Sequence, residues 1–156
     1  MKRIVIALST AFGLLLLGNA LAQVATVEIP GVETTAAKSS GLTALLMDGS
    51  VGEVKIVLRA VDANGDPVEG AAVSWTVKNS KDSVVYVVGS SATSQRMLMR
   101  AFKGMDLAVD GGTTDANGEA YLVVDSMTSG DTKVLVTVDE VAGKTYRGKD
   151  MRVVWF

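Results

Sequence analysis

The sequence predicts an all-β protein: a single antiparallel β-sandwich of about seven strands with one helical or irregular crossover insert. Apolar and polar residues alternate over several short stretches, which is the period of half-buried strands. Asn-Gly, Asp-Gly and Gly-Gly pairs separate these stretches and favour tight turns. The chain of 156 residues contains no Cys, so we expect the fold to depend on its apolar core alone.

The first 22 residues have the pattern of a secretory signal peptide. Lys2 and Arg3 form a basic start, residues 4–17 are mostly apolar, and Ala20-Leu21-Ala22 is a small-x-small cleavage site. The apolar run is shorter than the roughly 20 residues that a membrane-spanning helix needs. We therefore expect cleavage before Gln23, no transmembrane segment afterwards, and a location in the periplasm, on the cell surface or outside the cell.

The composition excludes several classes of function. Without Lys2 and Arg3 the chain has 13 basic and 17 acidic residues, a net charge of −4, which argues against a nucleic-acid partner. The absence of both His and Cys excludes Ser-His and Cys-His catalysis and argues against a transition-metal site. We expect a protein that is not an enzyme and that has no cofactor.

Residues 23–41 are predicted to be a strand-like segment followed by a linker. Residues 23–29 alternate, with Ala25 facing the same side as Val27 and Ile29, and Pro30-Gly31 ends the strand. The small, polar residues 34–41 form the linker. We favour an extra edge strand on the domain's own sheet. The alternative is a donor strand that completes a neighbouring subunit's sheet through Val24, Ala25, Val27 and Ile29.

Residues 42–156 are predicted to form the sandwich domain. Residues 42–47 are a first strand or a short helical turn, and residues 54–77 form a hairpin reversed at Asn64-Gly65. The predicted inward residues of this hairpin are Val54, Ile56, Leu58, Ala60, Val73, Trp75 and Val77. Residues 82–88 form a third strand because Val and Tyr favour strands.

The stretch from 90 to 104 has helical rather than strand spacing. Its apolar residues recur on one face, and its basic residues share another. We expect a short amphipathic helix or an irregular crossover that covers the core. The alternative is a docking element for a protein partner, for self-association or for an anionic envelope surface, made of Arg96, Met97, Arg100, Phe102 and Lys103.

The remaining strands are predicted from period-two patterns. Residues 107–109 form a short strand, Gly111-Gly112 opens a turn, and residues 142–144 make the last turn. The final strand covers residues 146–156, with one of Trp155 and Phe156 outside the core. The inward residues of the two strands before it are Ala120, Leu122, Val124, Val134, Val136 and Val138, with Lys133 and Thr137 outside.

Two turns carry a resemblance to a known family. The segments VDANGDPVEGAAVSWTV (residues 61–77) and TTDANGEAYLVV (residues 113–124) contain the same four letters, DANG. In this order they resemble the bacterial Ig-like domains of the invasin/intimin type, which implies a β-sandwich with a cell-surface or adhesive role. The carboxypeptidase regulatory-like (transthyretin-like) sandwich is similar too, but Trp75 and Ala120 favour the Ig-like family.

Two groups of polar residues resemble part of a calcium-binding loop or of a catalytic site, but each lacks residues that such a site requires. Asp62, Asn64 and Asp66 have the spacing that begins a calcium loop, but Pro67 stands where an EF-hand loop has Gly. Asx-Gly turn chemistry explains this spacing, and a weak calcium site shared between loops is the alternative. Ser90 and Ser91 have no His to activate them.

Three hypotheses of function follow. The first is an exported, non-enzymatic Ig-like module with a structural or adhesive role at the cell surface. The second is a subunit of an extracellular filament assembled by donor-strand exchange through residues 23–29. The third is a periplasmic accessory domain that binds a ligand or a partner, with an apolar pocket near residues 96–105.

Overall fold

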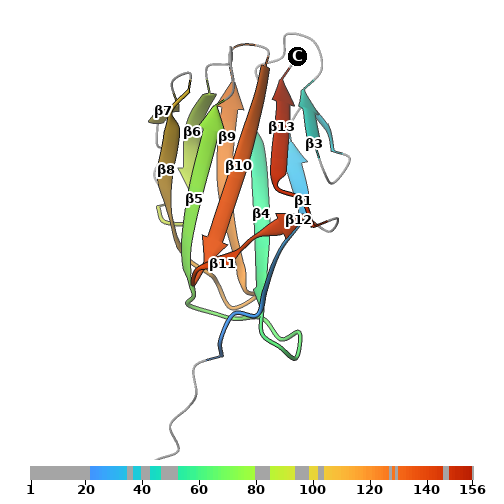
Figure 1. The fold of residues 1–156 in the computed structure, drawn as a ribbon, viewed down its shortest axis with the longest axis vertical. Helices are drawn as coiled ribbons and strands as arrows, with labels where there is room; N and C mark the ends of the chain where they lie inside the picture. The colour runs from blue at the N-terminus through green and yellow to red at the C-terminus, as the bar shows by residue number, and fades with distance from the viewer. Residues whose placement is uncertain are drawn as a thin grey trace, which may run out of the picture.

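The structure is a computed structural model of the chain. It describes residues 22–34, 37–39, 43–46, 53–79, 85–93, 99–101, 104–126, 128, 130–145 and 148–155. These residues form two β-sheets, which we call sheet A and sheet B, stacked face to face (Figure 1). The described part of the chain contains no helix that is long and apolar enough to span a membrane.

Sheet A has six strands. Neighbouring strands in it pair antiparallel, except that the last two strands at one edge pair parallel over a short stretch. From edge to edge its strands are β12 (Lys144–Thr145), β1 (Thr26–Thr34), β4 (Val54–Val61), β9 (Glu119–Ser126), β6 (Val85–Ser90) and β7 (Met99–Ala101).

Sheet B has the same mixed character, because β3 pairs parallel with β13 and the other neighbours pair antiparallel. Its order is β2 (Ala37–Ser39), β3 (Thr43–Leu46), β13 (Met151–Trp155), β10 (Gly130–Val138), β5 (Ala72–Asn79) and β8 (Asp106–Thr113), and β11 (Val141–Ala142) also pairs with β10.

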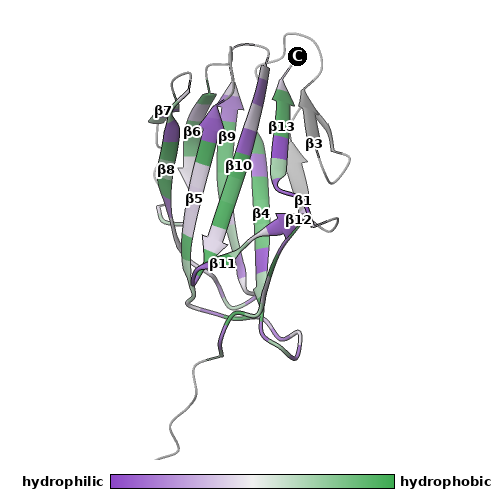
Figure 2. Cartoon of the chain, in the orientation of Figure 1, coloured by the Kyte–Doolittle hydropathy of each residue, from purple (hydrophilic) through white to green (hydrophobic). Residues whose placement is uncertain are grey.

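The predicted all-β sandwich is confirmed, and the core is the one that the period-two pattern indicates. Every residue predicted to face inward in residues 54–77 and 120–138 is buried, and Trp75 is completely enclosed. Hydrophobic stretches lie along β5 and β10, and the upper ends of both strands are hydrophilic (Figure 2). Trp155 is also buried, where its indole Nε1–H donates to Thr132 Oγ1 over 2.9 Å, whereas Phe156 lies outside the described residues.

The pairing order is that of an immunoglobulin sandwich, but the route of the chain differs. Strands β1-β4-β9-β6 correspond to A-B-E-D, and β13-β10-β5 correspond to G-F-C. In variable-type domains the strand beside C precedes D along the chain. Here β6, in the D position, comes before β8, which pairs with β5. The segment between β5 and β9 therefore crosses between the sheets in a different order.

Strand β1 belongs to the sandwich rather than to a separate N-terminal segment. It does not end at Pro30-Gly31 but continues to Thr34, because a β-bulge between Glu28 and Gly31 absorbs one extra residue opposite β4. Beyond it, the predicted linker contains β2, which pairs with β3. Residues 42–47 correspondingly contain a strand, not a helical turn.

The two DANG turns have the same geometry and lie against each other. In each, the Asp Oδ1 accepts hydrogen bonds from the amides two and four residues later, over 2.8–3.0 Å. Thr114 then joins the two loops, because its buried hydroxyl donates to the carbonyl of Val68 and accepts from the amide of Ala71. These contacts close the end of the sandwich at which β4 and β9 meet.

Three predictions for the second half of the chain differ from the structure, the first being the helical alternative for residues 90–104. Met99–Ala101 forms β7, paired with β6, so the predicted helix is absent from the described part of residues 90–104, and the irregular crossover is the better interpretation. Gly111 and Gly112 lie in β8 instead of a turn. A Cβ on Gly111 would come within 2.7 Å of Trp75 Nε1, so glycine allows β8 to pass over the indole.

The third is the last predicted turn, which is displaced. The chain reverses at Asp139-Glu140, three residues earlier than predicted, and residues 142–144 cross from β11 in sheet B to β12 in sheet A. Gly143 lies at this crossing, where a Cβ would come within 2.4 Å of Val136 Cγ1 and 3.2 Å of Val27 Cγ1. The crossing closes one side of the sandwich and places β12 beside β1.

Candidate functional site

The outer face of sheet B carries three cationic side chains in one row across three adjacent strands. Lys133 on β10 is directly opposite Lys78 on β5 and directly opposite Arg152 on β13. We call these three residues the cation row. Opposed residues on neighbouring strands lie about 5 Å apart, and like charges placed in this way are destabilising. The row therefore requires compensation from nearby anions.

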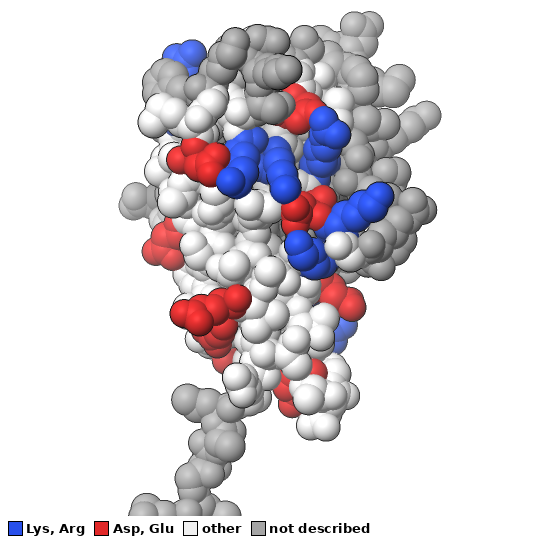
Figure 3. All heavy atoms as spheres, viewed as in Figure 1, with Lys and Arg blue, Asp and Glu red and all other residues white. Residues whose placement is uncertain are grey.

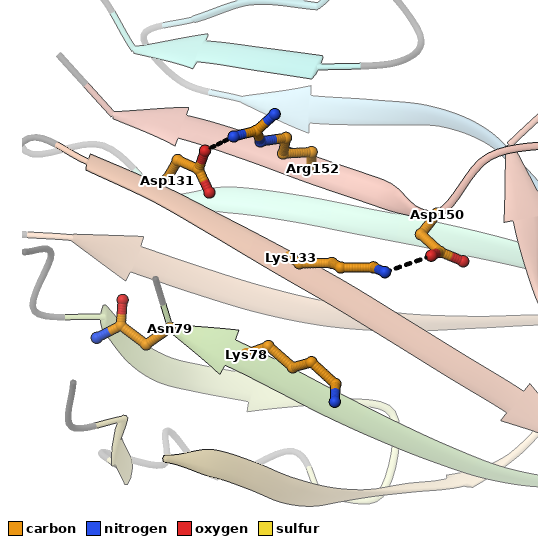
Figure 4. A pocket seen from close by; sticks show the side chains of 6 residues that line it. All are labelled: Lys78, Asn79, Asp131, Lys133, Asp150 and Arg152. Carbon is orange, nitrogen blue, oxygen red and sulfur yellow. Dashed lines mark ion pairs between the residues drawn. The ribbon is translucent and has the colours of Figure 1, made fainter. Parts of the chain in front are cut away.

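Three carboxylates supply that compensation, one for each member of the cation row. Asp106 lies 2.7 Å from Lys78 Nζ, Asp150 lies 2.6 Å from Lys133 Nζ, and Asp131 pairs with Arg152. Figure 4 shows the pairs of Lys133 and Arg152 on their neighbouring strands. Because these carboxylates come from β8, β10 and the residue before β13, the charge balance depends on the strand register.

The row and its carboxylates surround a shallow depression of about 460 Å³. Its lining residues are Lys78, Asn79, Asp131, Lys133, Asp150 and Arg152. The cationic side chains remain accessible, with exposed fractions of 42% for Lys78, 48% for Lys133 and 61% for Arg152. Figure 3 shows Lys and Arg gathered across the upper half of this face.

Asp150 is the carboxylate that pairs with two lysines. It accepts from the Lys133 ammonium, and its other oxygen lies 2.7 Å from Lys144 Nζ. Both hydrogen bonds favour the charged carboxylate and lower its pKa below the ordinary value of 3.8, with the hydrogen bond from Lys133 as the largest cause. Asp150 is therefore ionised at neutral pH and offsets two cations.

The opposite end of the sandwich is acidic. The described loops 62–71, 114–118 and 139–142 meet there and contain no Lys or Arg. We call their six acidic residues the acidic pole: Asp62, Asp66, Glu69, Asp115, Asp139 and Glu140. Backbone hydrogen bonds from Gly70 to Thr114 and from Asp139 to Ala72 hold the three loops together.

The Asp139-Glu140 turn of the acidic pole has an unusual backbone. Asp139 and Glu140 have φ angles of 45° and 69°, the left-handed region in which Gly, Asn and Asp are common and Glu is not. Asp139 is held there because its Oδ1 accepts from the amide of Ala72, 3.0 Å away. Glu140 is exposed and has no such anchor among the described contacts.

The calcium-like loops act as turns. The Oδ1 atoms of Asp62 and Asp115 each accept two backbone amides, as Asx turns require. Within the residues that the structure describes, no group of three or more acidic side chains could hold a metal ion. The geometry thus supports the turn interpretation of both DANG segments.

The two serines that resemble nucleophiles are framework residues. Ser90 Oγ donates to the carbonyl of Asp110 over 2.7 Å. Ser91 Oγ accepts from the amide of Tyr121 and donates to its carbonyl. Both hydroxyls tie the turn after β6 to neighbouring strands, one to β8 and the other to β9.

The predicted donor-strand residues lie in the chain's own sheet. Val24, Val27 and Ile29 are buried, whereas Ala25 is exposed, so the prediction that Ala25 faces the same side as Val27 is wrong. The reason is that regular strand geometry begins at Thr26, after the position of Ala25.

The predicted docking residues are described only in part. Arg96, Met97, Phe102 and Lys103 lie outside the described residues, and Arg100 is exposed on β7 of sheet A. The cation row lies instead on sheet B. Sequence reasoning placed Lys133 outside the core but had no signal for its neighbours, which are far from it along the chain.

Comparison with known proteins gives no family for this chain. No protein-family model matches it, and no curated protein matches it either.

Proposed function

We propose that this protein is an exported, non-enzymatic module of the cell surface with a structural or adhesive role. The observation that carries the proposal is the outer face of sheet B, on which Lys78, Lys133 and Arg152 form an accessible charged surface. A charged face of this kind suits contact with a large partner, because exposed charges govern specificity and rates of association.

Further support comes from the leader pattern of residues 1–22 and from the absence of His and Cys. The hydroxyls of Ser90 and Ser91 and the Oδ1 atoms of Asp62 and Asp115 are used by backbone groups. The side chains that most resemble catalytic or metal-binding groups are therefore bonded to the backbone, where they stabilise turns.

The first experiment is to express the full chain in a bacterium and to follow its processing with an antibody. We expect a mature protein that begins at Gln23 and that added protease can reach on intact cells. A matched Ala22→Glu variant should remain unprocessed, because signal cleavage requires a small residue there. Unprocessed wild-type protein in the cytoplasm would contradict the proposal.

A second candidate is a filament subunit that exchanges its N-terminal strand. The observation in its favour is that β1 fills a position between β4 and β12 with buried side chains, and a second copy could supply the same strand. A chain lacking residues 23–34 should then bind a synthetic peptide of those residues, and the intact chain should form polymers that resist high salt. A truncated chain that does not bind the peptide would exclude this candidate.

A further inference from the structure

We infer that the cation row is a docking surface for the acidic pole of a second copy of this chain, so that the protein associates head to tail. This inference rests on the proposed function, because it names a second copy of the chain as the partner in the proposed structural role. Three features of the molecule carry it: the unfilled bonding capacity of the row, the charge of the pole and the distance between the two.

The cation row has hydrogen-bonding capacity that its own carboxylates do not fill. Lys78, Lys133 and Arg152 each pair with one carboxylate among the described residues, whereas an ammonium has three donors and a guanidinium has five. All three side chains are more than two-fifths exposed. Additional carboxylates from outside would therefore find donors that now face water.

An external anion would also relieve the repulsion within the row. Lys133 has a cation directly opposite on both sides. Asp106 lies at one end of the row, opposite Lys78, and Asp131 lies on β10 two residues before Lys133, so neither carboxylate stands between the opposed cations. Counting Lys144, four cations meet three carboxylates on this part of the surface. The site favours a partner that brings negative charge and little positive charge.

The acidic pole has this chemistry. It presents six carboxylates on three loops that are bonded to one another, with no Lys or Arg in those loops. One of these loops is the Asp139-Glu140 turn, which has a left-handed conformation and follows the end of β10. The pole and the row are thus complementary in charge and lie on the same chain.

The two surfaces cannot meet within one molecule. Lys133 is the fourth of the nine residues of β10 and Asp139 directly follows that strand, so they are six residues apart, which is about 20 Å in a strand. Figure 3 shows Lys and Arg gathered in the upper half of this face, and Figure 1 shows that β10 ends in the lower part of the molecule, near β11. A contact between two different patches is heterologous, and it produces an open chain of subunits where the rotation does not close a ring.

The experiment uses two charge-reversal variants of the purified protein. One reverses the row (Lys78→Glu with Lys133→Glu), and the other reverses the pole (Glu69→Lys with Glu140→Lys). Both altered pole side chains are exposed, so folding should survive, and a melting curve of each variant checks this. Sedimentation velocity and negative-stain microscopy measure association at low and high salt.

We expect wild-type protein to associate at low salt and to dissociate as screening increases, since the Debye length falls to about 8 Å at physiological ionic strength. Each variant alone should associate at least roughly tenfold more weakly, because it opposes like charges. An equal mixture of the two variants should regain association, because the reversed pole of one fits the reversed row of the other.

The matched control reverses the same number of charges on sheet A (Lys55→Glu with Arg59→Glu) and should associate like the wild type. Three results would overturn the inference: a wild type that is monomeric at low salt, association that neither reversal weakens, or loss in the row variant alone, which would mean that another anion occupies the row. Correct processing at Gln23 in any of these cases would leave the proposed function standing.

Discussion

Each sheet carries a row of charged side chains, and the two rows differ in the order of their charges. On sheet A, the register places Lys144, Glu28, Arg59 and Glu119 in one line across β12, β1, β4 and β9, so the sign alternates at every step. On sheet B, the corresponding line is Asp106, Lys78, Lys133 and Arg152, with three cations side by side. Opposite charges on neighbouring strands stabilise a sheet, and like charges destabilise it.

The charge order of the row on sheet A is explained by the stability of the fold, whereas the charge order of the row on sheet B is not. Every neighbouring pair in the row of sheet A is attractive, so that row needs no partner. The row of sheet B is maintained through carboxylates outside the line of cations, chiefly Asp150 and Asp131. Local rules are broken most often at functional sites, which is why we place the docking surface on sheet B.

The alternating row of sheet A requires β1 to lie beside β4, because Glu28 would otherwise leave that row. Ile29 tests this placement, since its side chain is only 1% exposed and is the most buried among residues 26–30 of β1. We expect Ile29→Ala to lower the free energy of unfolding by about 2–4 kcal/mol. Urea denaturation measures the change. The control is Ala25→Ser at an exposed position, and equal effects of the two changes would place β1 outside the core.

The next largest effect should come from the carboxylate that supports the cation row. Asp150→Asn removes the partner of both Lys133 and Lys144, and we expect it to lower the free energy of unfolding by about 1 kcal/mol. Glu28→Gln, the matched change on sheet A, should cost less than about 0.5 kcal/mol, because Glu28 is exposed. Thermal and urea denaturation of both variants measure the two losses, and a larger loss from Glu28→Gln would reverse the expected contrast between the sheets.

A smaller gain is expected from a double variant that gives sheet B the alternating order of sheet A. Adding Lys133→Glu to Asp150→Asn yields the sequence of signs minus, plus, minus, plus across β8, β5, β10 and β13. We expect the double variant to regain about 0.5 kcal/mol relative to Asp150→Asn alone. Chemical denaturation of both variants provides the measurement. Further loss in the double variant would show that repulsion between opposed cations does not govern the stability of this row.

The last prediction concerns the dependence of the Asp150 contribution on pH. The pKa of Asp150 is lowered in the folded state, so its contribution is present above the ordinary value of 3.8 and is lost as the pH falls through the folded pKa. We expect the stability difference between wild type and Asp150→Asn to persist from neutral pH to about pH 4 and to shrink below it. Thermal melting from pH 2 to pH 7 measures it, and a constant difference would mean that the charge of Asp150 contributes nothing.

The strands and their inward faces were predictable because they depend on local periodicity. The residues Val54, Trp75 and Val138 alternate with polar neighbours, and a period of two is a strand signal whatever the strand pairs with. The DANG turns were predictable for the same reason, since each Asp side chain binds amides only two and four residues away.

The errors occurred where local signals are ambiguous. Met99–Ala101 lies in a segment with helical spacing, and its pairing with β6 overrides that spacing. Gly111 signalled a turn, but the constraint on it is the indole of Trp75 on a neighbouring strand. In both cases a contact distant along the chain determined the conformation.

The alternation of apolar and polar residues is a local property of the sequence. It was enough to specify the fold class, the composition of the core and the positions of most strands. The candidate site has a different origin, because it exists only once the strands are paired. Lys78, Lys133 and Arg152 become neighbours through the register of β5, β10 and β13, and register is a relation between strands that no single stretch of sequence contains. The separation of the cation row from the acidic pole is a consequence of the same pairing.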